Sequence, residues 1–188
     1  MTEPTLPAST GIAVRDRIFW PLLIAILAVD TLSKRWAEAA LQLHVPVDVV
    51  PPWLRWTLTY NTGAAMNLSV GGASRVIFSV VALVMIGYLV TVLRRSASSA
   101  RALPAALALI VAGAAGNLLD RLRHAKGVVD FIDVGTADWR FWTFNVADMG
   151  VTTGAVLLAL LLWREDAGAA QIPPTPSPPA SPSDDAAS

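Results

Sequence analysis

The sequence predicts an all-α membrane protein, with four transmembrane helices and a small extracytoplasmic β-sheet on the outer membrane face. Composition gives the first reason: 54% of the 188 residues are hydrophobic and only 15% are charged, whereas soluble domains carry about 25% charged residues. Second, several segments approach the roughly 20 apolar residues that a helix needs to cross a bilayer. Third, short segments between them alternate apolar and polar residues, the pattern of half-buried strands.

Three of the four predicted spans are clear from their length. Residues 76–93 and residues 102–119 each form a run of 18 residues without a charge. Residues 144–163 form a run of 20 residues with a single charge, Asp148, near its start. Each run is long enough for a helix that crosses the hydrocarbon layer.

The first predicted span is shorter than the others. Its apolar run, residues 18–29, contains only 12 residues, so it crosses the membrane only if the helix continues through Asp30 and Lys34. The alternative is a cleaved signal peptide with its cleavage site at residues 37–39. That site would lie about ten residues beyond the apolar run, and the intervening charges have helical spacing. We therefore favour a membrane helix.

The distribution of basic residues predicts that both termini face the cytoplasm. The link at residues 94–101 contains three Arg and no acid, and three further Arg flank the first and last spans on the same side. Short cytoplasmic segments carry such an excess of Lys and Arg. Residues 15–166 then form one membrane domain. A flexible tail is expected at residues 1–14, and a disordered Pro/Ser/Ala-rich tail at residues 167–188.

Three segments on the outer side are expected to form the sheet. In residues 54–60, Leu, Trp and Tyr alternate with Arg and Thr, which predicts a strand with one buried face. Residues 128–134 and 140–144 have a similar pattern and are separated by a turn-like segment at residues 135–138. Such a sheet would turn one face toward lipid or substrate.

In this topology the unusual polar residues fall at one membrane face. They lie at the ends of the first and third spans, near the starts of the second and fourth, and in the connection between the last two. Ionisable groups at such positions mostly face a protein interior or a wet cavity. Each alone has a structural explanation, such as an ion pair or a helix cap. Together they indicate a site: Asp30, Ser33, Lys34, Asn61, Asn117, Asp120, Arg121, Asp130, Asn145 and Asp148.

Residue types limit the chemistry of this site. The chain has no Cys and only two His, His44 and His124, so carboxylates are the main acid–base groups and a zinc site is not expected. The formal net charge of zero gives no attraction to nucleic acid. Two carboxylates in one site can share a proton, activate water and protonate a carbonyl oxygen. Asp130 and Asp148 can meet if a strand leads into a helix start, although their spacing alone does not establish it.

Five segments, in order, resemble the motif blocks of lipoprotein signal peptidase (signal peptidase II). The resemblance extends over residues 15–165 and places the blocks on the expected side of the four spans. The blocks are Asp30-Thr-Leu-Ser-Lys34, Asn61-Thr-Gly-Ala-Ala65, Gly113-Ala-Ala-Gly-Asn-Leu-Leu-Asp-Arg121, Gly127-Val-Val-Asp-Phe131 and Phe144-Asn-Val-Ala-Asp148.

This resemblance implies an aspartyl intramembrane endopeptidase of the bacterial inner membrane. Enzymes of this family remove the signal peptide from prolipoproteins by cutting just before a Cys that carries a diacylglyceryl group. The resemblance also implies that no metal or organic cofactor is needed. Prolipoprotein and membrane lipid are the expected partners, and we expect a monomer with its active site on the outer face.

The resemblance assigns roles residue by residue. Asp130 and Asp148 match the catalytic dyad. Asp120, beside Arg121, is expected to hold structure by pairing. Supporting and substrate-binding positions are matched by Asp30, Lys34, Asn61, Gly63, Asn117, Arg121 and Asn145.

Two residues depart from the family pattern. Met66 stands where an aromatic residue is usual, and Met149 where a small residue is common. Neither change removes a polar group, so both bear only on the shape of the pocket and its choice of signal-peptide side chains.

Two other classes of function compete with this interpretation. A small proton- or ion-coupled transporter would also place Asp, Asn and Arg in its spans, but it would have polar residues near mid-bilayer and on both sides of it. A structural membrane scaffold would tolerate Asp130→Asn and Asp148→Asn, whereas a catalytic dyad would lose turnover with either substitution.

Overall fold

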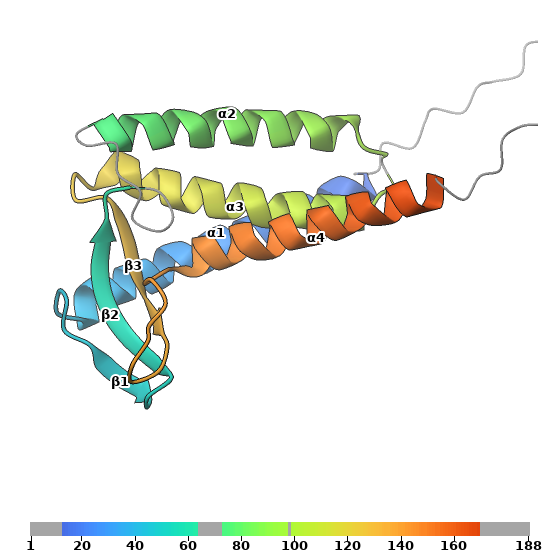
Figure 1. Ribbon diagram of the computed structural model, residues 1–188. Helices are drawn as coiled ribbons and strands as arrows, with labels where there is room; N and C mark the ends of the chain where they lie inside the picture. Colours follow the sequence, from blue (N-terminus) through green and yellow to red (C-terminus); the bar gives the residue numbers. More distant parts are fainter. Residues whose placement is uncertain (1–12, 64–72, 98, 170–188) are drawn as a thin grey trace, which may run out of the picture.

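The computed structural model describes residues 13–63, 73–97 and 99–169. Four long helices run along one another, and three strands gather at one end of them (Figure 1). The elements in chain order are α1 (Val14–Ala40), β1 (Val47–Val50), β2 (Leu54–Asn61), α2 (Ser74–Arg95), α3 (Ala102–Arg123), β3 (Val128–Val134) and α4 (Val146–Ala169).

Helix α3 is the centre of the helical layer, because it packs against each of the other three helices. Its buried residues run along most of its length, whereas α2 buries only three. Small residues allow the closest approach: a Cβ at Gly113 would collide with the main-chain oxygen of Ala147 in α4. The backbones of α3 and α4 therefore touch at the level where α4 begins.

Three helices in the described part of the chain are long and apolar enough to cross a membrane: α2, α3 and residues 146–164 of α4. Helix α1 continues without a break through Asp30 and Lys34, as predicted, and has 27 residues. Because its C-terminal half is polar, α1 is not among the helices that are apolar enough to cross a membrane by composition. Its crossing of the membrane therefore remains a prediction.

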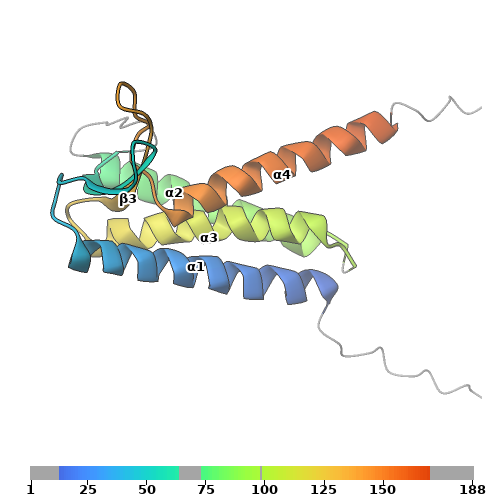
Figure 2. The same ribbon diagram turned by 90° about the horizontal axis from the view of Figure 1, so that it is seen from below.

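The predicted polar residues on α1, α3 and α4 lie at the ends of these helices near the sheet, and the first residues of α2 lie at the same end of the molecule (Figure 1). The first residues of α1 and the last of α4 lie at the opposite end of the molecule (Figures 1 and 2). Figure 2 also shows α4 leaning away from α3 toward its C-terminal end. The predicted tails, residues 1–14 and 167–188, lie almost wholly outside the described residues.

The sheet is antiparallel with the order β1-β2-β3. The predicted strands at residues 54–60 and 128–134 are confirmed as β2 and β3, whose register pairs Leu54 with Val134 and Asn61 with Val128. Strand β1 was not among the predicted strands, and all four of its residues are exposed, so it lacks the alternation that marks a half-buried strand.

The predicted strand at residues 140–144 is wrong. This segment is not a strand: it forms two isolated bridges, Ile132 with Phe144 and Gly135 with Arg140, and a few further main-chain bonds, such as that from the Phe141 N–H to the Val134 oxygen. Between these bridges the segment is one residue longer than the stretch that it faces, which interrupts the pairing locally. The irregular segment still lies along β3 and leads directly into α4.

An aromatic and aliphatic cluster fixes the sheet to α1. Ala37, Leu58, Val129 and Phe131 form its buried centre. The ring of Trp36 on α1 lies edge-on to those of Trp56 and Phe131, with centroids 5.7 and 6.0 Å away. Because edge-to-face aromatic contacts are directional, this cluster holds β3, and Asp130 with it, against the helices.

Candidate active site

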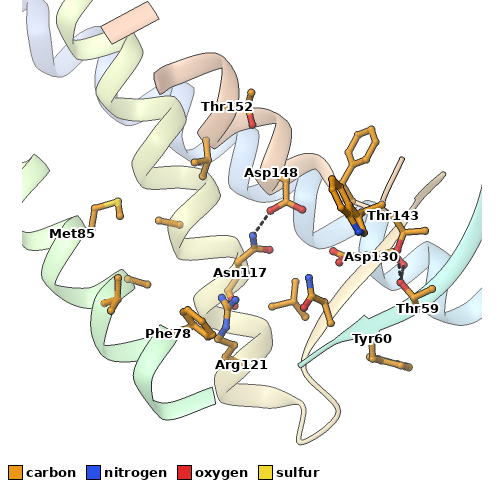
Figure 3. Close-up of a pocket in the computed structure, with 18 of the residues that line it drawn as sticks. Thr59, Tyr60, Phe78, Met85, Asn117, Arg121, Asp130, Thr143, Asp148 and Thr152 are labelled. Atoms are coloured by element: carbon orange, nitrogen blue, oxygen red, sulfur yellow. Dashed lines mark hydrogen bonds between the residues drawn. The ribbon is translucent and has the colours of Figure 1, made fainter. Parts of the chain in front are cut away.

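The start of α4 places Asp148 in the first helical turn. Asn145 caps the helix: its Oδ1 accepts the main-chain N–H of Asp148 at 2.9 Å. In return, the Asp148 Oδ2 accepts the main-chain N–H of Asn145 at 3.2 Å. This reciprocal pair is a capping box, built here from Asn and Asp. Asp148 therefore has a fixed side-chain direction, toward the cavity in Figure 3.

Asn145 also connects Asp148 to Asp130. Its Nδ2 donates to Oδ1 of Asp130 at 2.6 Å and to the main-chain oxygen of Val129 at 3.2 Å. Asn145 is fully buried, so these bonds are protected from water. One amide side chain thus contacts both carboxyl-bearing segments, the strand β3 and the first turn of α4.

Asn117 of α3 completes the contacts of the two carboxyl groups. Its Nδ2 donates to Oδ1 of Asp148 at 2.8 Å, as Figure 3 shows, and its Oδ1 accepts from Nδ2 of Asn145 at 3.1 Å. Asn61, the last residue of β2, hydrogen-bonds Asp130 through its side chain. Three Asn side chains therefore orient the two carboxyl groups.

The environment of Asp130 favours its protonated form. Its side chain is 2% exposed. This burial, and next the negative charge of Asp148, raise the pKa of Asp130 from 3.8 to about 7, against the hydrogen bonds from Asn61 and Asn145. Asp148 is less buried, and it accepts hydrogen bonds at a helix N-terminus, a position that suits a negative charge. The two carboxyl groups therefore differ in environment.

Arg121 lies near these carboxyl groups, one turn beyond Asn117. Its guanidinium donates from Nη2 to the main-chain oxygen of Gly63 at 3.0 Å and from Nη1 to that of Asn117 at 3.2 Å. It also lies 5.8 Å from the ring centroid of Phe78. Arg121 thus ties the end of α3 to the segment after β2 and to α2.

A cavity of about 720 Å³ opens beside the two carboxyl groups (Figure 3). Its polar lining includes Asn61, Asn117, Arg121, Asp130 and Asp148. The remaining wall is largely apolar and comes from α2, α4 and the segment before α4: Phe78, Val81, Ala82, Met85, Phe141, Trp142, Phe144 and Val151. The cavity therefore has one polar and acidic region and a long apolar region.

Asp30 and Lys34 lie behind the cavity and do not line it. They form the predicted i,i+4 ion pair, with Lys34 Nζ 2.8 Å from Oδ2 of Asp30. Ser33 does not join them, because its hydroxyl donates to the main-chain oxygen of Asp30 within the same helix. Asp120 pairs with Lys34 at 2.9 Å, and Arg121 instead binds main-chain oxygens.

Sequence reasoning missed a pair of hydroxyl groups in the cavity. The hydroxyls of Thr59 and Thr143 lie 2.8 Å apart, and both residues line the cavity. The alternation in β2 places Thr59 on the face opposite Leu58, which was the available signal.

Met149 is half exposed and does not line the cavity, and Met66 lies outside the described residues. No three His, Cys, Asp or Glu side chains in the described ranges are arranged to hold a metal ion.

Comparisons with known proteins give a consistent result. A family model described as Signal peptidase (SPase) II matches residues 22–164. The lipoprotein signal peptidase of Pseudomonas syringae pv. tomato is 43% identical over 152 residues, which cover 79% of this chain and 87% of that protein. The lipoprotein signal peptidase of Pseudomonas fluorescens Pf-5 is 37% identical over 162 residues, covering 85% and 94%. A solved structure titled "Bacterial membrane enzyme structure by the in meso method at 2.3 A resolution" matches with a TM-score of 0.72 and 25% identity, covering 82% of this chain and 93% of that one.

Proposed function

Because the chain belongs to the signal peptidase II family, we propose that it is an intramembrane aspartyl endopeptidase acting on prolipoproteins. It cuts the signal peptide just before a Cys that carries a diacylglyceryl group. The observation that carries this proposal is the pair of carboxyl groups, Asp130 and Asp148, which line one cavity. Asn145 bridges them: its side-chain NH2 donates to Asp130 and its main-chain N–H donates to Asp148. No cofactor is needed for hydrolysis by such a pair.

The unequal environments of the dyad suggest its division of labour. Asp148 is the general base: it takes a proton from water while the water oxygen bonds to the scissile carbonyl carbon. Asp130 is the general acid, since its raised pKa of about 7 keeps a proton available for the carbonyl oxygen. When the tetrahedral intermediate collapses, the C–N bond breaks and the leaving nitrogen takes a proton from Asp148. The carbonyl reforms as its hydroxyl proton returns to Asp130.

The apolar part of the cavity supports a lipid-modified substrate. Phe78, Val81 and Met85 lie along one face of α2, spaced by three and four residues, and all three line the cavity. Such a wall suits an acyl chain or an apolar signal-peptide side chain. Arg121 and Asn61 lie at the polar region, where they would bind the peptide backbone. Anchoring by the acyl chains would hold the scissile bond beside the dyad.

We also propose that all four helices cross the bacterial inner membrane, with both termini in the cytoplasm and the sheet on the outer face. Helix α1 has 27 residues, which span about 40 Å at 1.5 Å per residue, more than the roughly 30 Å of a hydrocarbon core. Its Asp30–Lys34 pair is internally compensated and buried against α3 and α4. The two termini of this four-helix domain lie at the end away from the sheet.

The test is cleavage of a diacylglyceryl-modified lipobox peptide by the full chain purified in detergent. The unmodified peptide should stay intact. Asp148→Asn and Asp130→Asn should each abolish turnover while leaving the thermal unfolding transition in place. Asp133→Asn is the matched control, because Asp133 is a buried carboxylate on the same strand as Asp130 but does not line the cavity. Full activity of Asp148→Asn would refute the dyad.

A further inference from the structure

Lys34 satisfies all of its donors behind the cavity. It is 3% exposed, and its Nζ lies 2.8 Å from Oδ2 of Asp30, 2.9 Å from Oδ2 of Asp120 and 3.0 Å from Oδ1 of Asn117. An ammonium group has three N–H donors, so each has one acceptor and two of the acceptors are charged. Because Lys34 does not line the cavity, it acts on the reaction through these three partners and through its positive charge, which lowers the pKa of Asp130.

The two carboxylates bound to Lys34 each accept a main-chain N–H from the residue before a proposed catalytic aspartate. Oδ1 of Asp30 accepts the N–H of Ala147 at 2.8 Å. Oδ2 of Asp120 accepts the N–H of Val129 at 3.2 Å. Ala147 and Val129 directly precede the two proposed catalytic aspartates, one on α4 and one on β3. A single cation therefore joins the backbone attachments of both.

Lys34 also fixes which way the Asn117 amide faces. An ammonium only donates hydrogen bonds, so Asn117 must turn its oxygen toward Lys34. Its NH2 group then faces Asp148, to which it donates at 2.8 Å. The reversed amide would oppose N–H to N–H at Lys34 and oxygen to oxygen at Asp148.

We propose that Asp30, Lys34 and Asp120 act as an ion clamp whose role is to position the catalytic dyad. The clamp sets the separation of β3 and the start of α4 by holding the residue before each dyad carboxylate. It also keeps the Asn117 amide in the orientation that Asp148 requires. These three are positioning residues, since none lines the cavity. The inference rests on the proposed function and adds to it that buried ion pairs fix the relative position of the two dyad carboxylates.

Gly116 offers a way to disturb the clamp without altering its charges. A Cβ at this position of α3 would collide with Oδ2 of Asp30 and press on the side chain of Ala147. Gly116→Ala therefore displaces Asp30 and its bond to the Ala147 N–H, which form one arm of the clamp. The other arm is Asp120 with its bond to the Val129 N–H. Asp120→Asn keeps an oxygen for that N–H but removes one of the two negative charges that hold Lys34. The two variants reach the dyad from opposite sides.

The experiment measures kcat, KM and the thermal unfolding temperature of the full chain in detergent, with the diacylglyceryl-modified peptide as substrate. Because a displacement of about 1 Å in a catalytic group can cost 100-fold in rate, we expect kcat to fall at least about tenfold in both variants, with KM little changed. The control is Leu107→Ala. Leu107 is fully buried in the apolar cluster in the other half of α3, so this variant should lower the unfolding temperature but keep kcat per folded molecule.

A merely structural role for the clamp gives a different result. In that case Gly116→Ala and Asp120→Asn would lower the unfolding temperature and leave kcat per folded molecule at the wild-type value, as in Leu107→Ala, and the proposal would be overturned. If one variant fails to fold, the variant on the other arm decides. Wild-type protein that does not cleave the lipidated peptide would refute the proposed function itself. Wild-type cleavage with unchanged kcat in the variants refutes the clamp alone.

Discussion

Lys34 among the helices and Arg140 beside the sheet both hold backbone segments together, but through different contacts. Lys34 binds only side-chain atoms, and its carboxylate partners in turn bind main-chain N–H groups. Arg140 binds Asp133 at 2.6 Å and reaches the main-chain oxygens of Pro52, Thr136 and Asp133 directly. The side chains of Lys34 and Asp30 are 3% and 1% exposed, against 21% and 10% for Arg140 and Asp133.

This difference in burial determines what each pair contributes. Removing one member of a buried ion pair lowers the stability of the fold strongly, because the remaining charge stays in a medium of low polarity. A partly exposed pair leaves its remaining member in reach of water. Removing one member of the group formed by Lys34, Asp30 and Asp120 should therefore cost more stability than the lost bond itself. Removing Arg140 or Asp133 should cost little more than the bonds that are lost.

The largest expected effect is that of Lys34→Met on stability. It leaves Asp30 and Asp120 close together without their cation, so the free energy of unfolding should fall by about 3–5 kcal/mol. Denaturant or thermal unfolding in detergent measures this loss. Lys126→Met is the control. Lys126 is exposed, and its Nζ lies 5.1 Å from the centroid of the Tyr60 ring, so the loss of unfolding free energy should be less than about 1 kcal/mol. Equal losses in the two variants would erase the contrast.

The second effect concerns Asp130, a buried carboxyl group that forms no ion pair with the described residues. Its pKa is raised from 3.8 to about 7 by burial and by the charge of Asp148. Between these pH values the folded state holds the proton more tightly than the unfolded state, so the free energy of unfolding should fall as pH rises from 4 to 7. The scale is about 1.4 kcal/mol for each pKa unit.

Asp130→Asn should remove this pH dependence. The variant is expected to be more stable than the wild type at pH 8 and similar to it at pH 4, as measured by unfolding temperature across the range. A wild type whose stability rises between pH 4 and 7, or a variant with the same slope, would contradict the raised pKa.

A smaller effect is expected in the sheet for Arg140→Gln. Glutamine can replace only part of the guanidinium contacts, and the exposed edge lets water satisfy the rest, so the loss should be about 1–2 kcal/mol. The activity assay adds a second measurement: because Phe141 and Trp142 follow Arg140 and line the cavity, KM should rise more than kcat falls. A loss as large as that of Lys34→Met would contradict the distinction drawn from burial.

The smallest effect is expected at the exposed pair of Arg55 and Asp48, which joins β2 to β1 at 2.7 Å. Asp48 is 53% exposed, so Arg55→Gln should cost at most about 1 kcal/mol. Salt should weaken the interaction further. Unfolding in low and high salt tests this, with a loss that grows in high salt as the contrary result.

Periodicity was sufficient to predict much of this architecture. The apolar runs located α2, α3 and α4, and the alternation around Leu58 and Val129 located β2 and β3. The exposed β1 lacks this alternation. Residues 140–144 have the alternation but form no strand, because their pairing depends on a match in length with β3, which the segment itself does not encode.

The site shows a similar division between local and non-local information. The spacing of Asn145 and Asp148 contains the capping box, which the motif alone could have revealed. Asn117 and Asp120 are three residues apart on α3 and so share a face with Gly113 and Gly116, which predicts that Asp120 turns toward other helices. That its partner is Lys34 depends on the rotation and depth of α1 against α3, and no spacing within either segment encodes them.

Asp148 both starts its helix and, as proposed, activates water. When its carboxylate takes up a proton, it becomes a weaker acceptor for the Asn145 N–H, so every turnover loosens the first turn of α4 and then restores it. Glutamate at this position would suit a capping box better, but its longer side chain would move the reacting oxygen. Stabilising the start of this helix and keeping the enzyme active are therefore opposing demands on one side chain.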